Sequence, residues 1–342
     1  MKQPPRLSSG FEGAGLQSND SNDFRSTADW QNLRLRAKLL RCVREFFDSR
    51  GFLEVETPIL SADTVVDRHL DPFWIEDDTL SRRLWLQTSP EFAMKRLLAA
   101  GYPDIFSVCR VYRDGEAGRK HQPEFTMIEW YRLGIGLDEI VTDTTQLIEH
   151  ALADSAPAAD PVQLEYHEAF LDATALCSRS ASVDELARAA NADDQLRAAI
   201  GDEKDDWLDL LLATAVIPRF PTDRLTVLRH YPASQAALAR QCPAGCDVAD
   251  RFEVFLGQVE LANGYVELTN AEEQAARMAA DNHSRELRGR PVRPIDHDLI
   301  AALEAGLPAC AGVAMGLERL QMVHDRTDDI RDVITFAIEP DA

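Results

Sequence analysis

Strand-like runs in this sequence come in adjacent pairs, and this pairing limits the possible folds more than any other feature. Residues 105–113 and 124–132 are separated by the polar, glycine-bearing segment 114–122, which predicts a hairpin with a long loop. Residues 252–268 predict a second hairpin, with Leu256, Gly257 and Gln258 as its turn. Strands do not alternate regularly with helices, and no glycine-rich nucleotide loop is present. We therefore expect an α+β fold, with an antiparallel sheet flanked by helices, and not a Rossmann fold.

Shorter predicted elements surround the two hairpins. Apolar residues recur every three or four positions from Leu33 to Phe47, which predicts a helix that ends before Gly51. A second helix is expected to open at Ser89, where a proline follows, and a third to run from Gly316 to about His324. Further strands are expected at residues 52–58, 84–87, 226–231 and 333–338.

The 342 residues divide by composition into a leader and one large domain. Residues 1–26 are rich in Ser, Gly, Asn, Asp and Pro and have no hydrophobic period, which predicts a disordered leader. Residues 27–342 are expected to form this one large domain. Within it, residues 138–218 are helical in pattern and rich in Ala, Asp and Leu, which predicts a helical insertion.

The charge balance is strongly acidic, and it bears on the class of partner. Lys and Arg number 36 against 58 Asp and Glu, which gives a formal net charge of -22. Proteins that bind nucleic acid normally carry a basic face, so the composition argues against a tRNA partner. Six scattered cysteines and no secretory segment favour a cytoplasmic protein with reduced thiols. No apolar run approaches the roughly 20 residues of a membrane span.

Basic residues concentrate on the first predicted hairpin and its loop. Arginine presents a planar fork to phosphate oxygens, so fixed cations beside a flexible loop suit a polyphosphate. A solvated face paired with local acids explains the same pattern equally well. The residues concerned are Arg110, Arg113, Arg119, Lys120 and His121.

Two other segments combine residue types that ligands require. Glu253, Glu260 and Glu267 recur on the second predicted hairpin, where inward-facing carboxylates would suit Mg²⁺. Alternation alone would instead make them the exposed face of an edge hairpin. Residues 312–320 join a small-residue strand to a helix and place Arg319 in its first turn. The glycines there permit close approach of a ligand, or serve only a tight connection.

These segments, in this order, resemble the motifs of class II aminoacyl-tRNA synthetases. The first helix with residues 51–58 looks like motif 1, residues 110–131 like motif 2, and residues 312–320 like motif 3. Three segments resemble in sequence the lysine branch of the class: residues 88–91 (TSPE), 121–131 (HQPEFTMIEWY) and 260–264 (ELANG). The resemblance implies a class II synthetase catalytic domain that uses ATP and Mg²⁺.

The resemblance also implies where ATP binds. Arg113 would bind the α-phosphate, Phe125 would stack on adenine, and Arg319 would contact the far end of ATP. Both arginines would act as catalytic residues, and Glu253 and Glu260 would hold Mg²⁺. Gly115 and Gln122 stand where the family usually has glutamate and asparagine, so the adenine amino contact would pass to the backbone or to Glu116. The implied ATP set is Arg113, Asp114, Gly115, Gln122, Phe125, Glu260, Leu261, Gly316 and Arg319.

The implied amino-acid pocket has acids at both ends, which suits a diamino acid. Glu91 would meet the amino group near the substrate carboxylate. Glu267 and Tyr131 would meet the distal ammonium, and Ser89 and Asn263 would complete the pocket.

Two features bear on the acceptor. A lysyl-tRNA synthetase carries an N-terminal anticodon-binding OB domain of roughly a hundred residues or more, and none is expected here. Ala314 stands where those synthetases have glycine, and one pocket methyl group is worth about 1 to 3 kcal/mol of discrimination. Both features favour the homodimeric paralogues that activate (R)-β-lysine, or lysine, and transfer it to a lysine ε-amine of elongation factor P.

Two alternatives stay open. One is a free-standing enzyme that forms a lysyl-adenylate, or a truncated lysyl-tRNA synthetase, with another acceptor. The other is an inactive regulatory paralogue, against which the intact Arg113, Glu260 and Arg319 count.

Overall fold

The computed structural model describes residues 26–338, apart from residues 69, 78, 80, 154, 156–158 and 243–246. The leader expected at residues 1–26 lies outside the described residues, except for Ser26.

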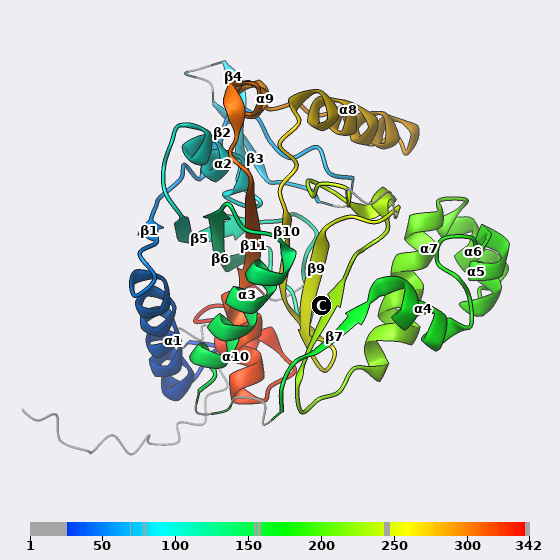
Figure 1. The fold of residues 1–342 in the computed structure, drawn as a ribbon, viewed down its shortest axis with the longest axis horizontal. Helices are drawn as coiled ribbons and strands as arrows, with labels where there is room; N and C mark the ends of the chain where they lie inside the picture. Colours follow the sequence, from blue (N-terminus) through cyan, green and yellow to red (C-terminus); the bar gives the residue numbers. More distant parts are fainter. Residues whose placement is uncertain are drawn as a thin grey trace, which may run out of the picture.

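An eight-stranded sheet forms the centre of the structure (Figure 1). It is antiparallel except at its two ends, where the outermost pairs of strands are parallel. This arrangement confirms the expected α+β fold with a mostly antiparallel sheet. In spatial order the strands are β1 (Leu53–Glu54), β5 (Ile105–Tyr112), β6 (Glu124–Leu133), β11 (Cys310–Gly316), β10 (Val259–Val266), β9 (Arg251–Leu256), β8 (Leu225–Arg229) and β7 (Val162–Glu165).

Both predicted hairpins are present. Strands β5 and β6 pair from Ile105 opposite Tyr131 to Tyr112 opposite Glu124. Strands β9 and β10 are joined through Gly257, whose positive φ of 56° suits glycine. A β-bulge interrupts their pairing between Glu260 and Ala262.

A small antiparallel sheet lies beside the large one. It contains β2 (Leu60–Ser61), β4 (Arg82–Leu86) and β3 (Trp74–Asp77), in that order. The strand expected at residues 84–87 corresponds to β4, whereas the strand expected at residues 52–58 is limited to Leu53–Glu54.

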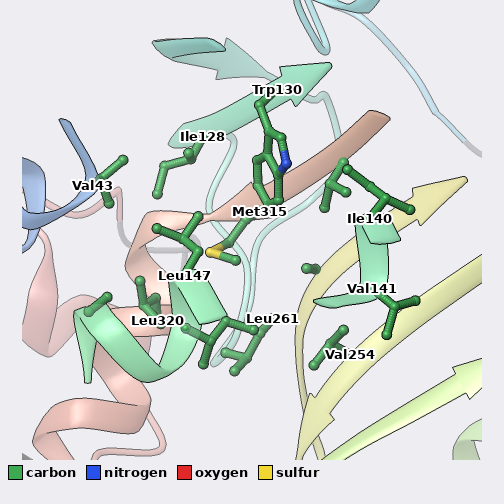
Figure 2. Packing of buried hydrophobic residues seen from close by; sticks show 14 of the residues in the cluster. Val43, Ile128, Trp130, Ile140, Val141, Leu147, Val254, Leu261, Met315 and Leu320 are labelled. Carbon is green, nitrogen blue, oxygen red and sulfur yellow. The ribbon is translucent and has the colours of Figure 1, made fainter. Parts of the chain in front are cut away.

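Three helices cover one face of the large sheet: α1 (Trp30–Asp48), α3 (Leu137–Ala151) and α10 (Leu317–Asp325). Helix α1 confirms the first predicted helix, and its N-cap Asp29 accepts a hydrogen bond of 2.8 Å from the backbone N–H of Asn32. Figure 2 shows the resulting core, in which Trp130 and Met315 from the sheet meet Leu147 and Leu320 from the helices. The opposite face of these strands is therefore free to carry polar side chains.

The region expected as a helical insertion is more varied than its composition indicates. Its first helix, α3, belongs to the central core because Ile140, Leu147 and Ile148 pack there, and β7 extends the sheet. The following helices share a separate core around Tyr166 and Trp207 (right side of Figure 1). These elements are α4 (Tyr166–Thr174), α5 (Val183–Ala189), α6 (Asp194–Ile200), α7 (Lys204–Leu211), a π-helical turn (Leu212–Val216) and a 3₁₀ turn (Ile217–Arg219).

Three more helices pack together near the other end of the sheet: α2 (Glu91–Ala99), α8 (Ala271–Leu287) and α9 (His297–Gly306). Helix α2 confirms the helix expected after Ser89, with Pro90 as its N-cap. Helices α8 and α9 were outside every predicted element. No helix in the part of the chain that the structure describes is both long enough and apolar enough to cross a membrane.

The strand expected at residues 333–338 is wrong. Residues Ile330–Val333 form a 3₁₀ turn, and no strand follows within the described residues. The backbone carbonyls of Ile334 and Thr335 accept hydrogen bonds from the N–H groups of Ala28 and Thr27, at 3.2 and 2.8 Å. Ile338 bonds through both backbone groups to the side-chain amide of Gln122, at 2.9 and 3.1 Å. These partners occupy the groups that a strand ladder would need.

Candidate active site

A cavity of about 660 Å³ lies over the polar face of the central strands. This volume is typical of a small-molecule site. Every residue that the sequence places in the ATP, amino-acid or metal set lines the cavity except Asp114 and Gly115. The backbone N–H of Asp114 donates to the carbonyl of Asp71 at 2.6 Å, and Gly115 has a positive φ of 78°.

Strand register determines which side chains share the cavity floor. Successive side chains of a strand point to opposite faces, so residues directly opposite one another form rows across the sheet. One row contains Glu129, Ala314, Asn263 and Glu253; the next row on the same face contains Tyr131, Gly312, Tyr265 and Arg251. Ala314 thus lies between an acid on β6 and an amide on β10.

Gly312 is fixed by close packing inside the cavity floor. A Cβ atom at this position would lie 2.4 Å from Cε1 of Tyr131 and 2.6 Å from Oε1 of Glu267. Only glycine leaves room for both side chains, which the motif-based expectation places at the distal ammonium.

Three carboxylates and one lysine form a buried cluster at one end of the cavity. Nζ of Lys95 lies 2.6 Å from Oε1 of Glu91 and 2.5 Å from Oε2 of Glu267. Burial opposes ionisation of Lys95, but the carboxylates of Glu267 and Glu91 outweigh it and raise the pKa of the ammonium. The third carboxylate, Glu129, has no lysine contact; it accepts hydrogen bonds of 2.7 Å from Ser89 and from Tyr131.

The cluster carries more acid than base. Glu91, Glu129 and Glu267 supply three carboxyl groups against the single ammonium of Lys95, so two carboxyl groups lack a cation within the cluster. Burial, followed by repulsion from Glu91, raises the pKa of Glu129 to about 8. Oε1 of Glu267 is buried with no hydrogen-bond partner among the described residues. A buried carboxylate without a partner is unfavourable, and a bound cation would relieve it.

The opposite end of the cavity holds the residues expected to bind ATP. The guanidinium of Arg113 lies 5.1 Å from the ring centroid of Phe125. Arg319 donates to Oε2 of Glu260 at 3.1 Å and contacts Nε2 of His121 at 2.6 Å. Burial, together with the charge of Arg319, lowers the pKa of His121, which keeps the imidazole neutral as an acceptor. The amide of Gln122 is already engaged by Ile338.

Two carboxylates at this end suit a divalent cation. Burial, and then repulsion from Glu260, raises the pKa of Glu253 to about 6, which indicates two carboxylates close enough to repel. Glu253 also accepts a hydrogen bond of 2.6 Å from Arg251. The described residues contain no group of three or more His, Cys, Asp or Glu placed to hold a metal ion. Two carboxylates fit Mg²⁺ that is shared with substrate phosphates.

The resemblance assigns no role to three residues that line or support the site: Lys95, Glu129 and Tyr265. Glu129 lies two positions before Tyr131 on the same face of the strand, and this spacing could have predicted that Glu129 also faces the site. Lys95 follows Glu91 by four residues, a spacing that commonly marks an exposed helical ion pair. Tyr265 alternates with Asn263 and Glu267 in the second hairpin. Its side-chain hydroxyl donates to Oε1 of Glu91 at 2.6 Å.

Comparison with known proteins agrees with this arrangement. The family model described as tRNA synthetases class II (D, K and N) matches residues 17–340. Curated relatives include proteins named elongation factor P--(R)-beta-lysine ligase from three bacteria. The relative from Klebsiella pneumoniae is 42% identical over 326 residues, which is 92% of this chain and 98% of the relative. That from Avibacterium paragallinarum is 42% identical over 322 residues, covering 93% and 98%. That from Mannheimia succiniciproducens is 43% identical over 319 residues, covering 92% and 97%.

A family model that spans nearly the whole described chain, together with relatives of this identity and coverage, leaves one assignment: the chain belongs to the class II tRNA synthetase family (D, K and N).

Proposed function

We propose that this chain is an ATP-dependent ligase that activates (R)-β-lysine as an adenylate and transfers it to a lysine ε-amine of elongation factor P. The curated relatives bear names that state this substrate and this acceptor. The observation that carries the proposal here is the excess of two buried carboxyl groups over cations in the cluster of Glu91, Glu129, Glu267 and Lys95.

A diamino acid matches this excess. Its carboxylate becomes a neutral acyl group once it is joined to the α-phosphate, and two ammonium groups remain to balance two carboxylates. A monoamino acid would leave one buried carboxylate without a partner, which is strongly unfavourable. Glu91 accepts the amino group nearer the carboxyl end, and Glu267 with Tyr131 accepts the distal one. Glu129 stands between them on the cavity floor.

Activation joins two anions, so the site must cancel charge and align the reacting groups. An oxygen of the amino-acid carboxylate attacks the α-phosphorus of ATP, and the bond from that phosphorus to the bridging oxygen of pyrophosphate breaks. Arg113 neutralises the α-phosphate, and Arg319 holds the far phosphates without donating a proton. Phe125 stacks on the adenine ring. Glu253 and Glu260 would hold Mg²⁺, which would supply further positive charge at the phosphates.

Transfer requires a neutral amine from the acceptor. Its nitrogen attacks the carbonyl carbon of the adenylate, the bond from that carbon to the AMP oxygen breaks, and the nitrogen loses a proton as the amide forms. Ser89 and Asn263 hold the amino acid in place during this step.

Ala314 supports β-lysine over α-lysine as the donor. Its methyl group lies between Glu129 and Asn263 in the cavity floor, where it reduces the space for an amino group on the carbon next to the carboxyl group. Such a methyl group is worth about 1 to 3 kcal/mol of discrimination.

We also propose a cytoplasmic homodimer that acts on a protein and not on tRNA. The segment that resembles motif 1, together with the two residues after it, exposes several large apolar side chains close together in sequence: Leu53, Ile59 and Leu60. Exposed apolar residues of this kind are typical of a protein interface. The net charge of -22 opposes binding of a polyanion such as tRNA.

Two assays test the proposal. Pyrophosphate exchange with (R)-β-lysine, α-lysine, ornithine and leucine should give the highest kcat/KM for (R)-β-lysine and no exchange with leucine. Mass spectrometry should then detect a β-lysyl group on elongation factor P, with lysine tRNA charged poorly or not at all. Equal exchange with leucine would contradict the charge argument. Efficient, salt-sensitive charging of tRNA with no modification of the factor would contradict the proposed acceptor.

A further inference from the structure

The hydroxyl group of Tyr265 contacts the amino-acid pocket at a point where the described function gives it no role. It lies 2.6 Å from Oε1 of Glu91. The same oxygen lies 2.6 Å from Nζ of Lys95, so one carboxylate oxygen accepts two short hydrogen bonds. The ring of Tyr265 also lies beside Lys95, with Nζ 5.5 Å from the ring centroid.

These contacts hold Glu91 from three sides. Glu91 opens helix α2, and its backbone N–H donates to Oγ of Ser89 at 3.0 Å. Lys95 lies one helical turn later and is itself fixed by Glu267 at 2.5 Å. Tyr265 stands on β10 opposite Gly312, on the cavity floor. The backbone of Glu91 is therefore held by Ser89, and its carboxylate is held by a buried ammonium on the same helix and by a hydroxyl group from the sheet.

Two hydrogen bonds at Oε1 leave Oε2 as the acceptor that Glu91 can offer to a ligand. In α-lysine and β-lysine the amino group nearer the carboxyl end is attached to adjacent carbons, so the nitrogen positions differ by about one C–C bond. A carboxylate held in one orientation favours one of these positions. A carboxylate that can rotate accepts either, because a charged hydrogen bond needs only correct local geometry.

We propose that Tyr265 is a positioning residue for donor specificity: its hydroxyl fixes the orientation of Glu91 and thereby selects where the substrate's proximal amino group lies. This rests on the proposed function, since it concerns the same amino-acid pocket. It adds a residue outside the motifs and assigns it a role that acts through Glu91 and not through direct contact with substrate.

The test is Tyr265→Phe, which removes the hydroxyl and keeps the ring beside Lys95. Hydrogen bonds to charged groups have a size that corresponds to about a 10- to 100-fold change in an equilibrium constant. We expect the KM for (R)-β-lysine in pyrophosphate exchange to rise within that range, with kcat and the KM for ATP nearly unchanged. The KM for α-lysine should rise less, so the preference for (R)-β-lysine should fall about tenfold. Thermal unfolding checks that the variant remains folded.

A double-mutant cycle separates this role from a structural one. If Tyr265 acts through Glu91, then Glu91→Gln alone should lose the same donor preference, and adding Tyr265→Phe to it should change neither KM further. Additive effects of the two substitutions would overturn the proposal. The control is Tyr102→Phe, which removes a hydroxyl from an exposed tyrosine outside the cavity and should leave all constants unchanged.

The outcomes also separate this inference from the proposed function. If the unaltered enzyme exchanges pyrophosphate with neither lysine isomer, the proposed function fails. If it activates (R)-β-lysine but Tyr265→Phe has unchanged KM values, or raises the KM for both isomers equally, only the role of Tyr265 in specificity is overturned.

Discussion

Replacing Glu129 by glutamine should make the protein more stable and less active, which is an unusual pair of effects. The carboxyl group of Glu129 is fully buried, and burial with repulsion from Glu91 raises its pKa from 4.5 to about 8. In the unfolded chain the group ionises freely near its ordinary value. Its contribution to folding stability is therefore fully present below pH 4.5 and is lost as the pH rises towards 8.

The size of the effect follows from the shift. One pKa unit corresponds to about 1.4 kcal/mol, and pH 7 lies 2.5 units above the ordinary value of 4.5. Keeping this group in the folded protein at pH 7 thus costs about 3 kcal/mol. Glutamine cannot ionise, and its amide can still bond to Ser89 and Tyr131. The free energy of unfolding of Glu129→Gln should exceed that of the unaltered protein by about this amount at pH 7, and the difference should shrink towards pH 4.5.

Activity should move in the opposite direction. Glutamine removes one of the two carboxyl groups that can ionise to balance the substrate's ammonium groups, so the KM for (R)-β-lysine should rise about 100-fold or more. In the unaltered enzyme this KM should fall between pH 6 and pH 8, because binding of a dication requires Glu129 to lose its proton. Glu129→Gln should lose the part of that pH dependence that comes from Glu129, while Glu267, whose pKa burial also raises to about 8, should keep its own part.

Urea unfolding between pH 4.5 and 8 and pyrophosphate exchange measure both effects. The matched control is Glu124→Gln, an exposed carboxylate at the start of the same strand, which should change stability by less than about 0.5 kcal/mol. A Glu129→Gln variant that is less stable at pH 7, with the pH slope of the unaltered protein, would show that Glu129 is ionised in the free protein and would refute the charge argument.

Three further predictions concern the same protein. Glu267→Gln should lower kcat/KM for the amino acid about 100- to 1000-fold, in line with the loss of one partner of a buried ion pair, while the KM for ATP stays constant; unchanged activation at low amino-acid concentration would exclude the assignment. Ala314→Gly should shift the ratio of kcat/KM for α-lysine and (R)-β-lysine about 10- to 200-fold towards α-lysine, and an unchanged ratio would make Ala314 a packing residue only. Sedimentation at micromolar concentration should give a dimer, and a monomer at all concentrations would contradict the interface proposed around Leu53, Ile59 and Leu60.

Sequence patterns within single segments were sufficient to predict the hairpins that carry most of the site residues. Alternation predicted both hairpins because their strands are adjacent in sequence, and the register of adjacent strands depends on nearby residues. The resemblance to the class II motifs assigned Arg113, Asn263, Glu267 and Arg319 to one site, and all four residues line the same cavity. The family assignment and the α+β fold are confirmed, whereas the roles of individual residues stay predictions.

Contacts between distant residues explain what the sequence did not reveal. Residues 333–338 are rich in β-branched and aromatic residues, as strands are, but their backbone groups bond to Thr27, Ala28 and Gln122, which lie more than 200 positions away. Lys95 has the sequence spacing of an exposed helical ion pair with Glu91. Its burial depends on packing against Glu267, which follows β10 and is distant in sequence. Burial of a charge depends on tertiary packing, which periodicity within one segment does not report.

The β-bulge between Glu260 and Ala262 determines which side chains of β10 face the cavity. Along a regular strand, positions 260 and 263 would face opposite sides of the sheet, because their separation is odd. The extra residue in the bulge changes this parity, so Glu260 points into the cavity with Asn263, Tyr265 and Glu267. Strand β10 can thus serve the phosphate end and the amino-acid end of the cavity at once. Deletion of Leu261 would restore regular alternation and place either Glu260 or the three downstream side chains against the hydrophobic core. The number of residues between Glu260 and Asn263 is therefore as important for the site as their identities.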